Sequence, residues 1–535
     1  MVDYRCEAFG MPEAGLRSGV RGHRLRPWQA QILQNWQLQG DSLVRRRGST
    51  QQGTVVSGMN KPITGLHHFY SGTTSARLAA AGTKWFYKIG GDWTDSGLAV
   101  TATKYTVAAQ YQGYGWIVNG TDTPQRFTPT TGAVTAWTTQ ASIIPQWVAG
   151  PYRQRLFYND AANPHRVYYT GQGTPQTTDA TSWLAVPDDQ NGNFPRIGMM
   201  VGNDWIGCFG QEHAVNLSGA SPLSFRTVKM PAGPGLVSWR TVVDMGGFVI
   251  LMTGDGPMIW DGYGPLIPID PRRTVDWSDV DYTTPEHCWA VRYHNKWILF
   301  YRSKAAAAAS TQTSPRMFGW MAGISSALLG LFRRVGAQSQ TSHFISYDLV
   351  TKTFDGPHTG CWLSGAQAQY RNSDRQELWL GHSGSAWGGV AITDQPDVYK
   401  DYDSSGTHAT YDSIFRSGSC VDDTFERHIF RGCRLQFGTS DKGSVRARVI
   451  FNGLDSHKDM QEEVLSLSRL GCENPQQRVE TDDDQAEGVW RRFGPDSAKK
   501  CSGYAPQLEL LCNSDVGASI DSYSMLCEAA AGNRR

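Results

Sequence analysis

The sequence has few charged residues and lacks the common catalytic motifs. Only 19% of its 535 residues are charged, and 50 lysines and arginines balance 49 aspartates and glutamates to a net charge of +1. A protein whose main task is to grip nucleic acid needs a surplus of basic side chains on one face, so this balance argues against that class. The patterns HExxH, GxSxG, GxxxxGK(S/T) and a GxGxxG after a strand are all missing. We therefore predict no catalytic residues and no enzyme activity.

Cysteine pairs and export signals are missing as well. None of the ten cysteines belongs to a CxxC pair, which argues against zinc-ribbon and thioredoxin-like sites. The first residues, MVDYRCEAFGMPEAG, lack the basic and then apolar stretch of a signal peptide, so we expect no secretory export and reduced core thiols. The acidic run ETDDDQAEG at 480–488 fails the EF-hand ligand spacing. We predict no metal site and no cofactor.

Glycine and aromatic residues are abundant instead, with 58 Gly, 19 Trp and 21 Tyr. Short apolar strands recur every ~40–50 residues, and each ends at a turn of Gly, Asn, Asp or Pro. The anchor residues of these strands are Trp85, Trp116, Leu156, Trp205, Phe248, Trp297 and Trp379. Each repeat has room for about four strands, which is typical of a β-propeller blade. We predict an all-β chain whose propeller has six to eight blades, with seven as the best count.

Two other segments flank the predicted propeller of residues 51–404. Residues 1–50 form a lead-in that ends in three arginines, and residues 405–535 change to strict alternation of apolar and polar side chains. The stretch APQLELLC places Leu508, Leu510 and Cys512 on one face, which is typical of strands with one buried and one wet face. We therefore expect a separate C-terminal β-sandwich.

An insertion, residues 303–342, interrupts the sixth predicted blade. Its alanine run favours helix, and residues 317–332 are almost wholly apolar but too short for the ~20 residues that span a bilayer. We predict a helical, apolar element. Two interpretations stay open: a helical hairpin packed on the propeller or a neighbouring subunit, and a tip that meets lipid or plugs a channel. The predicted contact residues of this tip are Met317, Phe318, Trp320, Leu328, Leu329, Phe332, Arg333 and Arg334.

Several phrases of the sequence, in their order, resemble the tail propellers of short-tailed bacteriophages. These proteins are the nozzle or tail-tubular proteins and the related tail-hub proteins that stabilise packaged DNA. The phrases are ILQNWQLQGDSLVRRRGST at 32–50, VNGTDTPQRFT at 118–128, LFYNDAANPHRVYYTGQGTPQTTDATSW at 156–183 and RTVVDMGGFVILMTGDGPMIWDG at 240–262. The resemblance covers about residues 25–300.

This resemblance implies a structural protein of the virion tail, assembled in the cytoplasm of the bacterial host. It implies a homo-oligomeric ring of six copies below the portal and the tail adaptor protein. Such a ring encloses the channel through which genomic DNA leaves without sequence-specific contacts, and tail fibres or a needle attach to it. A membrane contact of the insertion tip is a further expectation.

Arg45, Arg46 and Arg47 are the second predicted contact set, for a ring neighbour or the adaptor. The other interpretation of these arginines is a solvated strand end. For the whole chain, the alternative function is a glycan-binding or glycan-hydrolysing β-propeller, and a third is a membrane-inserting effector.

Overall fold

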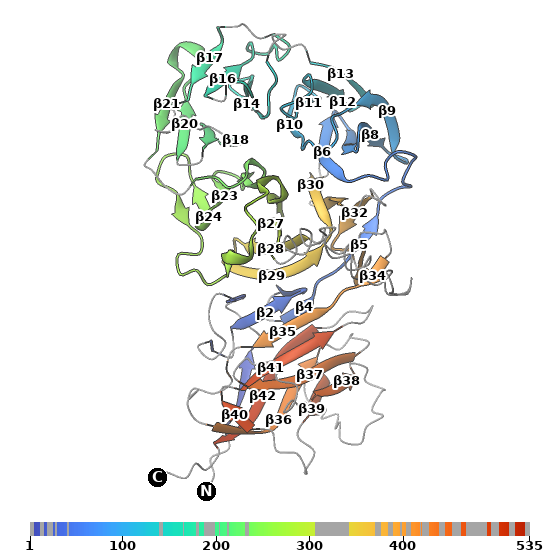
Figure 1. Cartoon of the computed structure of the whole chain (residues 1–535), viewed down its shortest axis with the longest axis vertical. Helices are drawn as coiled ribbons and strands as arrows, with labels where there is room; N and C mark the ends of the chain where they lie inside the picture. The colour runs from blue at the N-terminus through green and yellow to red at the C-terminus, as the bar shows by residue number, and fades with distance from the viewer. Residues whose placement is uncertain are drawn as a thin grey trace, which may run out of the picture.

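The computed structural model shows a ring of β-sheets joined at one side to a second all-β body (Figure 1). The structure describes residues 5–10, 15–18, 25–26, 29–39, 42–137, 143–163, 165–177, 181–186, 198–202, 204–210, 213–230, 235–304, 342–369, 376–383, 389–395, 398–402, 408–417, 419, 427–437, 444–451, 462–466, 489–493, 502–504, 506–512 and 519–529. The predicted helical insertion lies outside these residues from 305 to 341, and so does every predicted contact residue of its tip.

The first four blades follow one another along the chain as four-stranded antiparallel sheets. Blade one contains β6 (Ile63–Ser71), β7 (Thr74–Ala81), β8 (Lys84–Ile89) and β9 (Thr94–Ala99). Blade two contains β10 (Val107–Tyr111), β11 (Tyr114–Val118), β12 (Gln125–Thr128) and β13 (Ala133–Ala136). Blade three contains β14 (Val148–Tyr152), β15 (Arg155–Asn159), β16 (Arg166–Tyr169) and β17 (Trp183–Ala185). Blade four contains β18 (Gly198–Val201), β19 (Ile206–Phe209), β20 (Ala214–Ser218) and β21 (Arg226–Lys229).

Three more blades complete the ring. Blade five contains β22 (Val243–Asp244), β23 (Val249–Thr253), β24 (Gly256–Trp260) and β25 (Ile267–Pro268). Blade six contains β26 (Trp289–Tyr293), β27 (Lys296–Arg302), β28 (Ser342–Asp348) and β29 (Thr353–Gly360). Blade seven contains β30 (Trp362–Gln369), β31 (Gln376–His382), β32 (Val390–Thr393) and β5 (Ser49–Gln51). The 3-10 helix η2 (Pro222–Ser224) lies within blade four, between β20 and β21, and three others lie between blades, namely η3 (Trp239–Thr241), η4 (Trp277–Asp279) and η5 (Pro285–His287).

The ring closes through its innermost strands and through the lead-in. The first strand of each blade contacts the first strand of the next, and β30 of blade seven contacts β6 of blade one. Six of the blades are separate four-stranded sheets, and β26–β29 stands as the seventh at one end of a nine-stranded sheet. The outer strand of blade seven is β5, whose Thr50 pairs with Ile392. The predicted all-β propeller is therefore confirmed, and the strand pairing gives it seven blades.

The spacing of the anchor residues follows from where each sits in its blade. Trp116 lies in the second strand of blade two and Trp297 in the second strand of blade six, but Trp85 lies in the third strand of blade one. The second strand of blade one, TSARLAAA, is rich in alanine and has no large aromatic residue to mark it. This shift of one strand explains why the first interval between anchors is shorter than the others.

The turn GDGP at 254–257 is a hairpin corner of blade five, as predicted. Thr253 pairs with Gly256, so Gly254 and Asp255 form a two-residue turn between β23 and β24. We expected a glycine to supply the positive φ of this reversal, and Gly256 does so with a φ of 111°.

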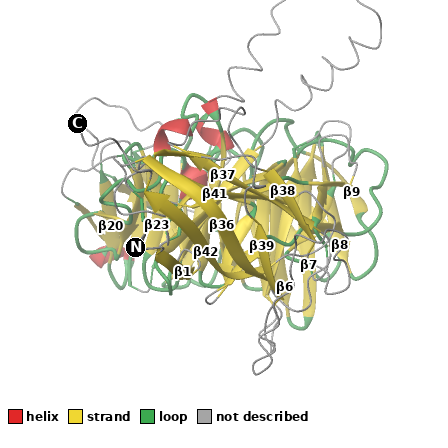
Figure 2. Cartoon of the chain, turned by 90° about the horizontal axis from the view of Figure 1, so that it is seen from below, coloured by secondary structure: helices red, strands yellow, loops and turns green. Residues whose placement is uncertain are grey.

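The second body consists of two packed sheets, which appear as two layers in Figure 2. The first layer contains β1 (Arg5–Gly10), β3 (Trp36–Gln39), β4 (Ser42–Arg45), β42 (Ser519–Ala529), β36 (Arg427–Phe437), β39 (Val489–Phe493) and β40 (Ser502–Tyr504). The second layer contains β2 (Ala30–Gln34), β35 (Ser413–Ser417), β41 (Pro506–Cys512), β37 (Ser444–Phe451) and β38 (Glu462–Ser466). A separate hairpin of β33 (Lys400–Tyr402) and β34 (His408–Thr410) precedes them.

The lead-in is not a separate strap, because its strands belong to both bodies. Strands β1, β3 and β4 lie in the first layer of the sandwich, where β1 and β4 both pair with β42. Strand β2 connects β29 of blade six to β35 of the sandwich, so that one nine-stranded sheet runs from the propeller into the second layer. The boundary that we expected near residue 50 is therefore crossed by the strands that join the two bodies.

The sandwich strands follow the predicted alternation on one face only. Leu508, Leu510 and Cys512 are buried between the layers, as expected. Glu509 points to the other face, which we predicted to be wet, and yet it is only 1% exposed. Arg416 holds this carboxylate through a hydrogen bond of 2.7 Å from its Nε atom, and Arg448 binds its other oxygen. A buried carboxylate needs such partners, because leaving it unpaired would cost several kcal/mol.

Blades four and five pack so closely at Gly262 that there is no room for a larger side chain. Gly262 has a φ of 94°, and a Cβ atom on it would lie 2.3 Å from the indole ring of the buried Trp205. We predict that Gly262→Ala lowers the free energy of unfolding by about 3 kcal/mol through this clash and the backbone strain. Gly254→Ala is the control, because a Cβ there meets nothing within 4 Å. Denaturant unfolding of both variants checks the prediction, and equal midpoints would contradict it.

Candidate functional site

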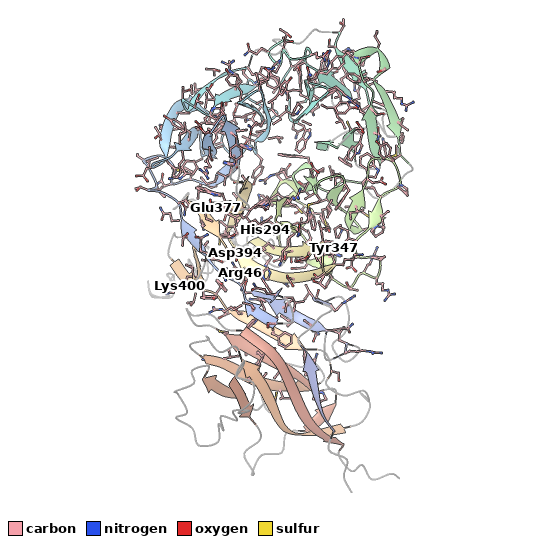
Figure 3. The ribbon with its side chains drawn as sticks, turned by 180° about the vertical axis from the view of Figure 1, so that it is seen from behind. Arg46, His294, Tyr347, Glu377, Asp394 and Lys400 are labelled. Carbon is pink, nitrogen blue, oxygen red and sulfur yellow. The ribbon has the colours of Figure 1, made fainter. Side chains whose placement is uncertain are left out.

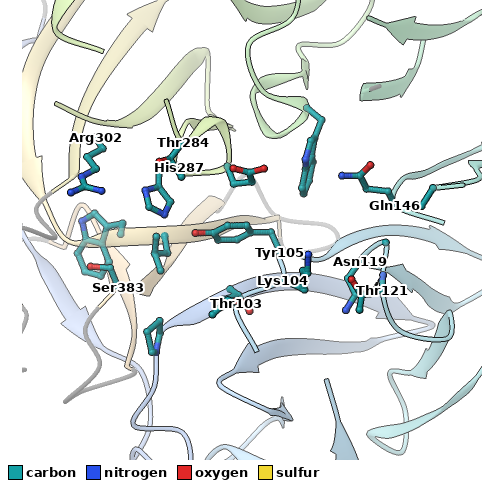
Figure 4. Close-up of a pocket in the computed structure, with 18 residues that line it drawn as sticks. Thr103, Lys104, Tyr105, Asn119, Thr121, Gln146, Thr284, His287, Arg302 and Ser383 are labelled. Carbon is teal, nitrogen blue, oxygen red and sulfur yellow. Dashed lines mark hydrogen bonds between the residues drawn. The ribbon is translucent and has the colours of Figure 1, made fainter. Parts of the chain in front are cut away.

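A cavity of about 700 Å³ opens at one end of the propeller axis (Figure 4). We call it the axial pit. Its walls come from segments just before the first strand of a blade or just after the second strand, because these segments meet at the same end of the ring. Six of the seven blades contribute side chains, all except blade four. The residues used below are Thr64, Lys104, Tyr105, Gln146, Trp239, Glu286, His287 and Arg302.

Arg240 lies against the lining of the pit and ties four blades together. It precedes blade five, and its guanidinium lies 3.9 Å from the ring centroid of Tyr105, which precedes blade two. The same group donates hydrogen bonds to the backbone oxygens of Glu286 at 2.5 Å and Leu363 at 2.6 Å. Leu363 belongs to blade seven and Glu286 precedes blade six. These contacts cross the axis of the ring and close it at this level.

The charge of Arg240 meets only neutral oxygen atoms and aromatic rings. Among the described residues it forms no ion pair with a carboxylate. Burial lowers the pKa of Arg240 to about 10, and neighbouring Tyr105, Cys288 and Glu286 only partly oppose this shift. The group therefore stays protonated at neutral pH and gives this end of the axis a positive potential. Burial also raises the pKa of Tyr105, which stays neutral.

Two neighbouring histidines of β6 have lowered pKa values because they are buried close to arginines. His67 Nε2 lies 2.7 Å from the hydroxyl of Thr106, and burial together with Arg240 lowers the pKa of His67 to about 4. His68 Nε2 lies 2.8 Å from the hydroxyl of Ser75, and burial together with Arg77 lowers its pKa to about 3. Both rings are neutral at pH 7 and serve as hydrogen-bonding groups between strands.

The pit has one carboxylate. Glu286 is the single Asp or Glu among its lining residues, which also include the basic side chains of Lys104 and Arg302. Glycoside hydrolysis requires two carboxyl groups on either side of the bond that breaks, so this lining does not support a hydrolase. In the part of the chain that the structure describes, no three His, Cys, Asp or Glu side chains gather as a metal site. No described helix is long and apolar enough to cross a membrane.

Two of the three predicted contact arginines are buried within the chain. Arg45 is 1% exposed, and it donates hydrogen bonds to the Ser413 hydroxyl at 3.0 Å and the Tyr411 backbone oxygen at 2.9 Å. Arg46 is 4% exposed, forms an ion pair with Asp401 and lies 4.3 Å from the ring centroid of Tyr411. Burial alone would lower the pKa of Arg46. The contact with Asp401 outweighs burial, so the pKa of Arg46 is raised.

These contacts place Arg46 at the junction of ring and sandwich, where Figure 3 labels it. Neither Arg45 nor Arg46 is open to a ring neighbour or an adaptor, so the prediction is wrong for these two. A solvated strand end is also the wrong interpretation, because strands β33 and β35 supply their partners. Arg47 alone is exposed, beside a cavity of about 370 Å³ that all three arginines help to line.

The insertion starts at the end of the ring that carries the pit. Arg302, the last residue of β27, lines the pit and pairs with Ser342, the first residue of β28. Arg302 and Ser342 therefore pair at the two ends of the segment where the sequence predicted an insertion.

Sequence reasoning missed the residues that line the pit. Trp239, Tyr105 and Gln146 are far apart in the chain, and each lies just before the first strand of a blade. No local spacing relates them, because a propeller brings one short segment from each blade to the axis. The signal that could have found them is positional: polar residues just before the first strand of several repeats.

Comparisons with known proteins show a likeness in fold only. No protein-family model matches the sequence, and no curated protein matches it. Among solved structures, BamB from Moraxella catarrhalis aligns over 68% of this chain and 94% of its own, with 10% identity and a TM-score of 0.35. The WD40 repeats of RRP9 align over 65% of this chain and 99% of their own, with 8% identity and a TM-score of 0.40. The computationally designed Ika8 protein covers 71% of this chain at 9% identity and a TM-score of 0.35.

The contacts of Arg240 predict a large effect on stability. Arg240→Met keeps much of the side-chain volume but removes the two hydrogen bonds and the contact with Tyr105. We predict a loss of about 3 kcal/mol in the free energy of unfolding, because two carbonyl groups lose their donors. The control is Arg226→Met on the exposed outer strand of blade four, which should change stability by less than ~0.5 kcal/mol. Equal unfolding midpoints for the two variants would refute the role of Arg240.

The lowered pKa of His67 predicts a pH dependence. In the unfolded chain its pKa lies near 6.5, and in the folded chain it is about 4. As the pH falls from 6.5 to 4, the unfolded state takes up a proton that the folded state refuses, so stability decreases in that window. His67→Gln can keep a hydrogen bond to Thr106 and should flatten this slope, whereas His294→Gln at an exposed position should not. Denaturant titrations from pH 4 to 7 measure both slopes, and parallel curves for all three proteins would contradict the assignment.

Proposed function

We propose that this chain is a structural, non-catalytic subunit of the tail of a short-tailed bacteriophage. Six copies form a nozzle or hub ring below the portal and adaptor, and the ring surrounds the channel through which DNA is ejected. Tail fibres or tip proteins bind to this ring. The proposal combines the order of sequence phrases that resemble tail propellers with one observation, the continuous sheet that joins propeller and sandwich.

The continuous sheet supports a role as a wall segment. Strand β2 bonds to blade six on one side and to the sandwich on the other, and a single apolar core runs through both bodies. That core includes Trp297 of blade six, Trp36 of the lead-in and Leu510 of the sandwich. Packed cores resist bending, because side chains in them interlock at the density of organic crystals. A body of this kind transmits force between neighbours without a hinge.

The closed axis of the propeller supports a channel between subunits. Arg240 and Tyr105 meet across the ring, so the axis of one chain offers no passage for a DNA duplex. A conduit built from this protein therefore needs several copies arranged around a shared axis. The near-neutral charge of the chain suits such a wall, because a wall that neutralised many phosphates would hold the DNA.

The predicted tip residues, from Met317 to Arg334, keep their proposed role as contacts with neighbours, tip proteins or lipid. The support for this role is the position of the hairpin that carries them. Its first described residues leave blade six at the mouth of the axial pit, on an end face of the ring rather than on its rim.

The mass of the particle in solution tests whether six copies form the proposed ring. The proposal predicts a species of six times the 59.1 kDa chain mass at tens of micromolar protein. Analytical ultracentrifugation gives the mass, and negative-stain electron microscopy shows whether the particles are rings with a central opening. A monomer at every concentration, or an open filament, would contradict the proposal.

The affinity of the ring for DNA tests whether DNA can slide along the proposed channel wall. At ~50 mM salt the assembled ring should bind duplex DNA no more tightly than ~1 µM, because its charge releases few counterions. Fluorescence anisotropy with a labelled duplex measures this affinity. Nanomolar binding with a steep salt dependence would contradict a wall along which DNA slides.

A further inference from the structure

The axial pit has the size of a ligand site. Its volume of about 700 Å³ falls within the ~300–1,000 Å³ of typical small-molecule pockets. Six blades fix its lining, so the cavity exists without a ligand. The hydrogen bonds of Arg240 to Glu286 and Leu363 hold two parts of that lining in place.

Several polar groups of the lining lack partners. The hydroxyl of Thr64 is buried without a hydrogen bond among the described residues, although Thr64 is only 5% exposed. The side-chain amide of Gln146 and the hydroxyl of Thr284 also make no hydrogen bond within the described chain. Gln146 and Thr284 are half-buried, so a ligand that enters the pit can reach these two side chains and supply their hydrogen bonds.

The arrangement of these groups indicates the type of ligand. The two accessible groups, Gln146 and Thr284, are neutral and precede blades three and six on the wall of the pit. Figure 4 shows Gln146 and His287 on opposite sides of Tyr105. A ligand with several hydroxyl groups around a compact ring can meet such scattered donors and acceptors, whereas a bare ion cannot. Trp239 and Tyr105 add aromatic surface for the apolar faces of a sugar ring.

The charges of the pit indicate the sign of the ligand. Lys104 is exposed in the lining and forms no ion pair with any described residue, and Arg240 lies directly behind Tyr105. Arg302 adds a third basic group, against the single carboxylate of Glu286. Figure 4 shows Lys104 next to Tyr105 in the middle of the pit, where its ammonium group can bind an acid.

We propose that the axial pit binds an acidic sugar, a mono- or disaccharide unit that carries a carboxylate. The carboxylate binds Lys104 in the positive potential of Arg240, and the sugar hydroxyls bind Gln146 and Thr284. The site binds without cleaving, since Glu286 has no second carboxylate opposite it. This binding does not require ring assembly, so its failure would leave the proposed tail function intact.

The test is calorimetric titration of the full chain with five probes. These are glucuronic acid, its disaccharide with glucose, the matching neutral disaccharide, acetate and inorganic phosphate. The acidic disaccharide should bind at least ~tenfold more tightly than the neutral one and than acetate. Equal affinity for acidic and neutral sugars, tightest binding of phosphate or acetate, or no binding of any sugar would overturn the proposal.

The affinities of variants show whether the ligand binds in the pit. Lys104→Gln should weaken the acidic disaccharide ~tenfold and leave the neutral one unchanged, whereas Gln146→Ala should weaken both sugars. Lys229→Gln on the exposed outer strand of blade four is the matched control and should change neither. Thermal unfolding confirms that each variant is folded before titration. Loss of binding in the control, or full binding in Lys104→Gln, would contradict the assignment.

Discussion

The pairing of the chain's first strands with its last ones is the constraint on which the rest of the structure depends. Within residues 30–51 the chain bonds in turn to the second sandwich layer, the first sandwich layer and the outermost position of blade seven. β4 pairs with β42, and β5 pairs with β32. Blade seven is therefore complete only when the lead-in has reached β32, and the first sandwich layer only when β1 and β4 have met β42. Such long-range pairings fold slowly but leave no independent domain that can swing freely.

Buried charges reinforce this constraint at two places. Arg46 joins the lead-in to Asp401 at the junction of ring and sandwich, and Arg240 joins four blades across the axis. The two arginines differ in their partners: Arg46 binds a carboxylate, whereas Arg240 donates to backbone oxygens. A carboxylate neutralises Arg46, whereas Arg240 forms no ion pair with a described carboxylate and lies behind Tyr105 of the pit lining.

The repeat pattern of the sequence predicted the blades well, because each blade needs short apolar strands between glycine-rich turns. It also located the insertion between Arg302 and Ser342. Two features escaped it. Arg45 and Arg46 looked exposed because a run of three arginines in a strand has no local partner, and Asp401 lies more than three hundred residues away. The pit escaped for the same reason, since Thr64, Lys104 and Gln146 are neighbours only after the ring closes. The spacing of apolar residues indicates which side chains of a strand are buried, but it does not indicate which distant residues they contact.

We propose that propeller and sandwich move as one rigid body, as a segment of a channel wall must. A distance distribution between the two parts tests it most directly. Spin labels carried by unnatural amino acids at Leu223 in blade four and Arg446 in the sandwich lie at exposed positions, so labelling leaves the core intact. Double electron–electron resonance should give a single narrow distance, unchanged between the free chain and the assembled ring. A broad or two-peaked distribution in the free chain would mean that the bodies move independently, and the account would be wrong.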